Sequence, residues 1–127
     1  NEFSAVIGIE QLKKLDKMND RRKKIAKFYD KEINTDKKIP FNSGCSYHLY
    51  WILVKNRDYL LKKMNEKNVE VGIHYKPIHI MKLYNNKTKL PVTENAGSSI
   101  ITIPIHPNLT QDNLTEIVKL VNKYAKF

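Results

Sequence analysis

The feature that most constrains the fold of this sequence is a long amphipathic helical pattern over residues 2–33. Apolar side chains recur at steps of three and four residues, the spacing of one helix face. They are Phe3, Val6, Ile7, Leu12, Leu15, Met18, Ile25, Phe28 and Tyr29. We therefore expect one long helix. In it, Gly8 is either tolerated at a cost or allows a neighbouring element to approach closely. The basic run at residues 21–24 is expected on the solvated outer side.

This helical pattern begins with the first residues of the chain, without a cap or a lead-in. Complete domains rarely begin in this way. We therefore expect either that residues were removed upstream or that the chain is a piece of a larger protein.

The remaining segments alternate between strand and helix patterns. A stretch rich in aromatic and β-branched residues predicts a strand over 46–54. A helix is expected from about Asn56, which could cap it, with Tyr59, Leu60 and Met64 pointing inward. Alternating apolar and polar residues at 69–73 predict a second strand, followed by a loop-rich stretch over 76–97 with one helical turn around 78–84.

The last part of the sequence predicts a strand and a closing helix. "SSIITIPI", residues 98–105, is typical of a third strand, and the helix that follows has Thr110 as a good N-cap. Its apolar face comprises Leu114, Ile117, Val118 and Val121. The order α–β–α–β–loop–β–α favours a single α+β domain, a small α/β sandwich in which helices cover a small sheet.

Composition leaves two classes of partner open. Lys and Arg number 23 against 13 acidic residues, for a net charge of +10, which suits a basic module that binds nucleic acid or another polyanion. Nearly all of this surplus is lysine, which lacks the bidentate fork of arginine, and the lysines are scattered. Nucleic acid is therefore the less favoured partner.

Cysteine content and hydropathy indicate the compartment. Cys45 is the single cysteine, which excludes an internal disulfide and fits a reducing compartment. No apolar run approaches the roughly 20 residues of a membrane span, and residues 1–12 do not resemble a signal peptide. We expect a soluble, cytoplasmic protein without a membrane partner.

The octapeptide "GIHYKPIH", residues 72–79, contains the densest group of candidate ligand-binding side chains. His74 and His79 lie five residues apart across a proline, which is not the i, i+4 spacing of a helical zinc pair, and no cysteine is near. No metal site is expected. The segment follows a predicted strand, a common place for ligand contacts, and its imidazoles and phenol could bind a polar ligand beside Lys76. The residues alone leave a substrate-facing turn and a purely structural turn both open.

Other kinds of catalytic site find little support. Cys45 precedes His48 by three residues, but nothing identifies a third group that would orient a nucleophile. The four glycines do not form a phosphate-binding loop, and the carboxylates are spread thinly.

Four motifs, in order along nearly the whole chain, resemble the DegT/StrS family of pyridoxal-phosphate-dependent sugar aminotransferases. The first helix carries the family's small-apolar-Ile-Gly step, Gln-Leu, Arg pair and Ala-x-x-Tyr, here residues 5–8, 11–12, 21–22 and 26–29. "SYHLYWILV" with "NRDYLLKKM" resembles the next strand and helix. "VEVGIHYKPIHIMKLY" and "LPVTENAGSSIITIPIHPNLTQDNLTEIV" resemble the family's last two segments.

The resemblance implies a specific part of a specific enzyme. It covers the C-terminal domain, about the last third, of an aspartate-aminotransferase-like (fold type I) enzyme that aminates a keto sugar nucleotide. The resemblance also implies glutamate as the amino donor and a homodimer as the state of the full-length enzyme. The family's cofactor-binding domain and Schiff-base lysine lie upstream, so no catalytic or cofactor-binding residue is expected in this chain, which should be inactive alone. By the same resemblance His74, Tyr75, His79 and Tyr84 are the expected substrate-binding residues.

Overall fold

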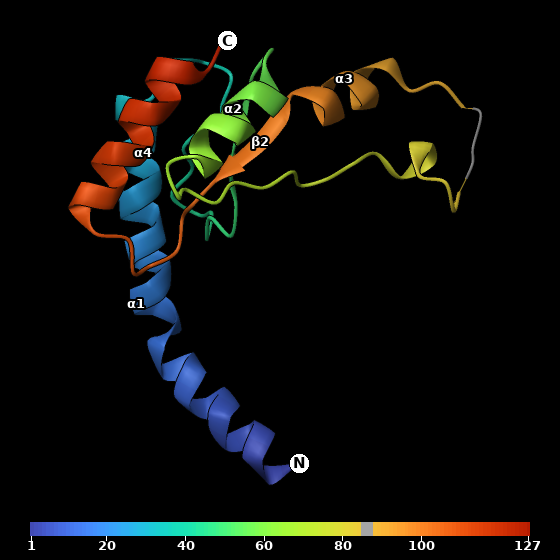
Figure 1. Cartoon of the computed structure of the whole chain (residues 1–127). Coiled ribbons are helices and arrows are strands. Elements are labelled where there is room, and N and C mark those ends of the chain that lie inside the picture. Colours follow the sequence, from blue (N-terminus) through green and yellow to red (C-terminus); the bar gives the residue numbers. More distant parts are fainter. Residues whose placement is uncertain (85–87) are drawn as a thin grey trace.

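The computed structural model describes residues 1–84 and 88–127 and contains two strands and four α-helices in the order α1–β1–α2–η1–α3–β2–α4 (Figure 1). The α-helices are α1 (Glu2–Glu32), α2 (Arg57–Asn65), α3 (Pro91–Ser99) and α4 (Gln111–Tyr124), and η1 (Ile78–Ile80) is a single 3-10 turn. Strands β1 (Tyr50–Leu53) and β2 (Ile100–Ile103) pair antiparallel, with Tyr50 opposite Ile103. The predicted α+β class is confirmed. None of the helices in the described ranges is long and apolar enough to cross a membrane.

The predicted long helix is confirmed as α1, but two expectations about it are wrong. Asn1 caps its start, because its side chain accepts a hydrogen bond from the Ser4 amide at 2.9 Å. The basic run is also not simply solvated. The Arg21 guanidinium donates to the Leu109 carbonyl at 2.6 Å and so attaches α1 to the loop before α4. A Cβ at Gly8 would meet nothing within 4 Å, so no neighbouring element in the described part of the chain requires that glycine.

The sheet is smaller than the sequence predicts. Tyr47 has a left-handed φ of 51°, which interrupts the extended backbone before β1 begins at Tyr50. The strand expected at 69–73 is only an isolated bridge, in which Gly72 and Thr102 exchange backbone hydrogen bonds of 3.0 and 2.8 Å. On the other side of the sheet Lys38 forms a similar bridge with Ile52.

Helix α3 is absent from the sequence-based prediction, which placed a loop-rich stretch over 76–97. Pro91 occupies the first turn of α3, where a missing N–H has no cost, and the Glu94 carboxylate accepts from the Leu90 amide at 2.8 Å. These local signals outweigh the loop-forming composition around them. The expected turn near Ile78 is confirmed as η1, and residues 85–87 of the predicted loop lie outside the described residues.

The core lies where the C-terminal half of α1, the sheet, α2 and α4 meet. Leu60 and Met64 of α2 are buried as predicted, whereas Tyr59 is 49% exposed and the inward placement predicted for it is wrong. Thr110 caps α4 in a capping box with Asn113. The predicted apolar face of α4 is confirmed, since all four of its residues are buried: Leu114, Ile117, Val118 and Val121.

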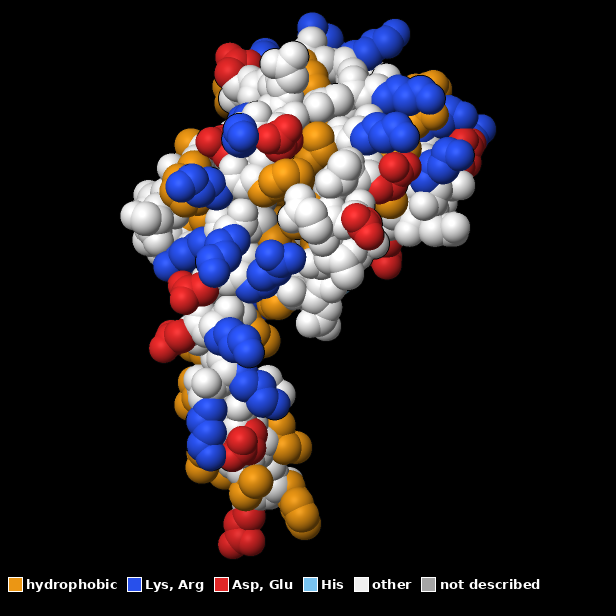
Figure 2. All heavy atoms as spheres, turned by 90° about the vertical axis from the view of Figure 1, so that its left-hand side faces the viewer, with side chains coloured by type: hydrophobic (Ala, Val, Ile, Leu, Met, Phe, Trp, Pro, Cys, Tyr) orange, Lys and Arg blue, Asp and Glu red, His pale blue; other side chains and the backbone are white. Residues whose placement is uncertain are grey.

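Two parts of the chain project from this core (Figure 1). The N-terminal half of α1 extends well beyond α4, and Figure 2 shows hydrophobic side chains at the surface of this projecting half beside lysines. The second projection carries η1 and α3 away from α1. Of the predicted substrate-binding residues, His74 and Tyr75 lie on the segment that leads from the core into this second projection, His79 lies in η1, and Tyr84 follows η1.

Candidate functional site

The segment that contains "GIHYKPIH" begins against the sheet and then departs from it. Gly72 is paired with Thr102 of β2, and His74 follows two residues later. A Cβ at Gly72 would lie 2.4 Å from Cε1 of His74 and 3.1 Å from the Thr102 hydroxyl. A side chain at this position would displace the imidazole ring, so glycine allows His74 to pack here.

His74 is held by a contact to the sheet. Its Nδ1 lies 2.7 Å from Oγ1 of Thr102, and the ring of Tyr75 packs edge-on against it, with centroids 4.8 Å apart. Tyr75 itself is 69% exposed. The structure thus brings the first two predicted site residues together, one anchored to β2 and the other open to solvent.

His74 lines a pocket of about 490 Å³ that contains three of the four histidines of the sequence. The side chains with polar groups on its wall are Arg22, His48, Glu70, His74, Thr102 and His106. They come from α1, the loop before β1, the 69–74 segment, β2 and the loop after β2. Such a wall can donate and accept hydrogen bonds toward a ligand with hydroxyl and anionic oxygens.

Five polar members of this wall escaped sequence reasoning: Arg22, His48, Glu70, Thr102 and His106. His48 and His106 are far from His74 in sequence, so no local spacing could join them. The bridge between Gly72 and Thr102 and the pairing of β1 with β2 bring them together. Arg22 falls in a run that the helical pattern assigned to the solvated face.

His79 and Tyr84 do not share this pocket. They line a different one of about 540 Å³, with Lys76, Pro77 and Leu90 among its walls. The side chain of His79 is only 9% exposed, and its Nε2 lies 3.1 Å from the Glu94 carboxylate. Tyr84 is 58% exposed. The four predicted residues therefore form two groups, His74 with Tyr75 and His79 with Tyr84.

The contact between His79 and Glu94 joins η1 to α3. The Glu94 carboxylate accepts a hydrogen bond from the Leu90 amide and also contacts His79. Both hydrogen bonds lower the pKa of Glu94 below its usual range, and the bond from the Leu90 amide has the larger effect. The Glu94 side chain is 42% exposed, so its contact with His79 lies near the surface. His79 is already engaged by a protein side chain, whereas Nε2 of His74 has no hydrogen-bond partner among the described residues.

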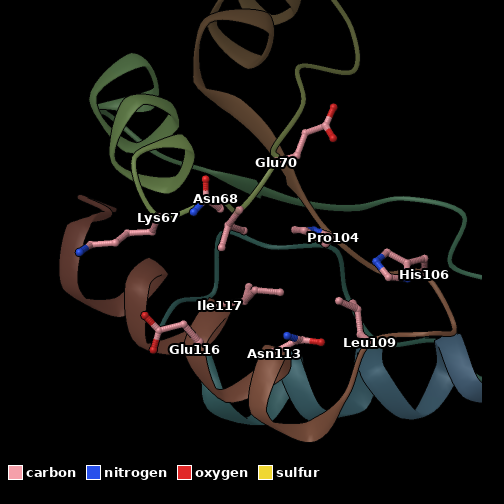
Figure 3. A pocket seen from close by; sticks show the side chains of 10 residues that line it. Lys67, Asn68, Glu70, Pro104, His106, Leu109, Asn113, Glu116 and Ile117 are labelled. Atoms are coloured by element: carbon pink, nitrogen blue, oxygen red, sulfur yellow. The ribbon is translucent and has the colours of Figure 1, made fainter.

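A third pocket adjoins the His74 pocket and shares Glu70, Pro104 and His106 with it. It has a volume of about 590 Å³, and Figure 3 shows Ile117 and Leu109 on one side of it with Glu70 and Lys67 on others. Asn113, another wall residue, already serves the capping box of α4. This pocket extends the hollow around His106 toward α4.

The charged side chains are mixed in sign, and no metal-binding group stands out among the described residues. On the face drawn in Figure 2 the lysine and arginine side chains are interspersed with acidic ones and do not form one continuous basic patch. Across residues 1–84 and 88–127, no group of three or more His, Cys, Asp or Glu side chains is arranged to hold a metal ion.

The chain has relatives of known chemistry. It is 30% identical to dTDP-3-amino-3,6-dideoxy-alpha-D-galactopyranose transaminase of Aneurinibacillus thermoaerophilus, over 98% of this chain and 36% of that protein. It is 28% identical to GDP-perosamine synthase of Escherichia coli O157:H7, over 94% of this chain and 35% of that protein. The chain thus spans about a third of the length of the curated relatives that it matches.

Solved structures agree on the fold. Spr1654 of Streptococcus pneumoniae, determined in a PLP (pyridoxal phosphate) form, superposes with a TM-score of 0.89 at 21% identity, over 97% of this chain and 35% of that one. The model of the DegT/DnrJ/EryC1/StrS aminotransferase family matches residues 1–122. This chain therefore belongs to the DegT/DnrJ/EryC1/StrS aminotransferase family.

Proposed function

We propose that this chain is the C-terminal domain of a larger, PLP-dependent aminotransferase that aminates a keto sugar nucleotide, and that the pocket around His74 faces the sugar nucleotide. The observation that carries the proposal is the match of residues 1–122 to an aminotransferase family, combined with a pocket whose polar wall includes His74. The names of the relatives from A. thermoaerophilus and E. coli support a nucleotide-linked amino sugar as product.

The substrate-binding residues proposed here are His74, Tyr75, His79 and Tyr84. His74 and Tyr75 form the inner pair, because Nε2 of His74 is free of described partners and the Tyr75 hydroxyl is on an exposed ring. His79 and Tyr84 form an outer pair, in which His79 supports the segment through Glu94. Hydrogen bonds from the inner pair would orient the sugar relative to the reacting amine.

The described wall of the His74 pocket does not by itself fit the cofactor. PLP enzymes hold their cofactor through a lysine Schiff base and a partner for the pyridine nitrogen, and the described wall of the His74 pocket contains no lysine. When bound to the complete enzyme, PLP acts as the electron sink for the carbanion formed in transamination. The role proposed for this chain is restricted to binding and orienting the substrate.

We further propose glutamate as the amino donor, a homodimer as the state of the complete enzyme, and the cytoplasm as its compartment. The exposed apolar residues on the projecting half of α1 support the homodimer, because the corresponding helix of the family lies near the dimer interface. The single cysteine, Cys45, is unpaired and supports a reducing compartment.

The deciding experiment is an intact-mass measurement and an absorbance spectrum of the protein purified from its native source. We expect a chain about three times longer than this one, in line with its coverage of the relatives, and a cofactor band that shifts when glutamate is added. A native chain of 14.9 kDa without a chromophore would contradict the proposal.

The substrate-facing role of His74 is tested in that enzyme with His74→Ala. Loss of one hydrogen bond to the substrate should raise KM for the sugar nucleotide about tenfold, which corresponds to about 1.4 kcal/mol. Lys119→Ala is the matched control, because Lys119 is 72% exposed on α4 and lines none of the pockets described above. Equal KM values for the two variants would remove His74 from the substrate site.

A further inference from the structure

Three residues at the edge of the His74 pocket form a closed hydrogen-bond cluster. The backbones of Gly72 and Thr102 exchange two hydrogen bonds, so the Gly72 carbonyl lies against β2. The Thr102 hydroxyl oxygen lies 3.2 Å from this same carbonyl oxygen and 2.7 Å from Nδ1 of His74. Thr102 is 5% exposed and is the one buried polar residue of the described core.

The direction of the single Thr102 hydroxyl proton determines which ring nitrogen of a neutral His74 is protonated. A threonine hydroxyl has one proton, and a carbonyl oxygen can only accept. If that proton pointed to Nδ1, the hydroxyl and carbonyl oxygens would face each other at 3.2 Å without a proton between them. If it points to the Gly72 carbonyl, both contacts become hydrogen bonds, provided that Nδ1 of His74 carries a proton and donates to Oγ1.

We propose that Thr102 is a positioning residue that fixes the neutral His74 ring as its Nδ1–H tautomer and so presents Nε2 to the pocket as a hydrogen-bond acceptor. In this tautomer Nε2 has a lone pair and no proton. Its ligand partner must therefore be a donor, such as a hydroxyl group. A diphosphate oxygen is an acceptor and does not satisfy it.

This inference rests on the proposed function for the identity of the ligand and adds which part of it His74 meets. Of the groups on a sugar nucleotide, the sugar hydroxyls can donate to Nε2, and the ionised diphosphate oxygens cannot. The guanidinium of Arg22, on the same wall, is the group suited to an anionic oxygen. The ligand therefore has one orientation in the pocket, with its sugar toward His74 and its diphosphate toward Arg22.

The cluster is tested by ¹⁵N NMR of the imidazole nitrogens, whose chemical shifts and two-bond couplings distinguish the two neutral tautomers. In the unchanged protein, at a pH where the His74 ring is neutral, we expect the Nδ1–H form. Thr102→Val removes the hydroxyl and keeps a β-branched side chain in β2, and it should shift the population toward the Nε2–H form. Thr102→Ser retains the hydroxyl and should retain the Nδ1–H form.

Two results would overturn the inference. One is an Nε2–H tautomer in the unchanged protein. This result does not depend on the variant, so it counts even if Thr102→Val fails to fold. The other is the same tautomer population in a folded Thr102→Val variant. Because this measurement needs neither substrate nor turnover, it can fail while the aminotransferase proposal stands, and the reverse is also true.

Inorganic pyrophosphate tests which part of the ligand His74 contacts. Added at the same pH, it should leave the nitrogen signals of His74 in the neutral Nδ1–H pattern. Conversion of the ring to the doubly protonated form by pyrophosphate would show that His74 donates to anionic oxygens, and would overturn its assignment to a sugar hydroxyl.

Discussion

The two halves of α1 carry the same apolar periodicity, but they end in opposite environments. Ile25, Ala26 and Tyr29 in the C-terminal half are fully buried against the sheet and α4. In the N-terminal half, Phe3 is 83% exposed and Leu12 is 68% exposed. The spacing of apolar residues therefore predicts that a helix has a face to bury, but it does not tell which molecule covers that face.

The largest expected contrast between the two halves is in stability. Ile25→Ala should lower the free energy of unfolding by about 2–5 kcal/mol, because it leaves a cavity in a closely packed core. Ile7→Ala is the matched control and should change it by less than about 0.5 kcal/mol, since Ile7 is 62% exposed. Urea unfolding of both variants measures the difference. Comparable losses would mean that the N-terminal half is covered in solution.

A second contrast concerns two buried tyrosines whose rings pack together, Tyr29 in the C-terminal half of α1 and Tyr50 at the start of β1. The Tyr29 hydroxyl donates to the Pro104 carbonyl at 2.7 Å, and burial raises the pKa of this hydroxyl, so it remains a donor. Tyr29→Phe should cost about 1.5 kcal/mol, because Pro104 loses its partner. The Tyr50 hydroxyl is buried without a hydrogen-bond partner among the described residues, so Tyr50→Phe should be neutral or stabilising. Thermal unfolding distinguishes them, and equal losses would contradict the assignment.

The caps of the helices sharpen the comparison further. Thr110→Ala removes the side chain that accepts from the Asn113 amide and should cost about 1 kcal/mol, because α4 is part of the core. Asn1→Ala removes a similar bond at the projecting end of α1. It should fray that end and leave the global transition almost unchanged. Hydrogen exchange of the first-turn amides, measured beside urea unfolding, would reveal a global role of Asn1 if one exists.

The smallest effect is expected in the second projection, at Glu94. Its pKa is lowered from 4.5 in the folded chain, so its contribution to stability is complete above pH 4.5 and is lost as the pH falls through the lower folded value. Glu94→Gln keeps an oxygen for the Leu90 amide but has no charge to titrate. The unfolding midpoint of the unchanged protein should therefore fall slightly more than that of the variant on acidification below pH 4.5. Parallel pH profiles would exclude this role.

Much of the fold follows from local patterns in the sequence. The helix over 2–33, the helix after Asn56 and the cap at Thr110 are correct because each depends on neighbours within a few residues. The strand expected at 69–73 fails for a physical reason. Alternation shows that a segment can lie against a sheet, but among the described residues of this segment only Gly72 forms a backbone bridge to β2, and His74 contacts β2 through its side chain alone.

The candidate site was less accessible to sequence reasoning. His74 and Tyr75 could be proposed as substrate-binding residues because they stand together in a motif with a family resemblance. Arg22, His48 and His106 could not, because chain pairing places them on one wall, and no spacing in the sequence encodes that pairing. The separation of His79 from His74 depends on Glu94, whose helix was itself not predicted.

The side chain of Asn56 has a consequence for how the chain folds. At the start of α2 it makes no capping hydrogen bond; it donates instead to the Tyr124 carbonyl and accepts from the Lys126 amide, 68 and 70 residues away. Contacts across such long loops form slowly, because the loop must close before they contribute. We therefore expect the start of α2 to become ordered only when the C-terminal end of α4 packs against it, so that these two helix ends fold together.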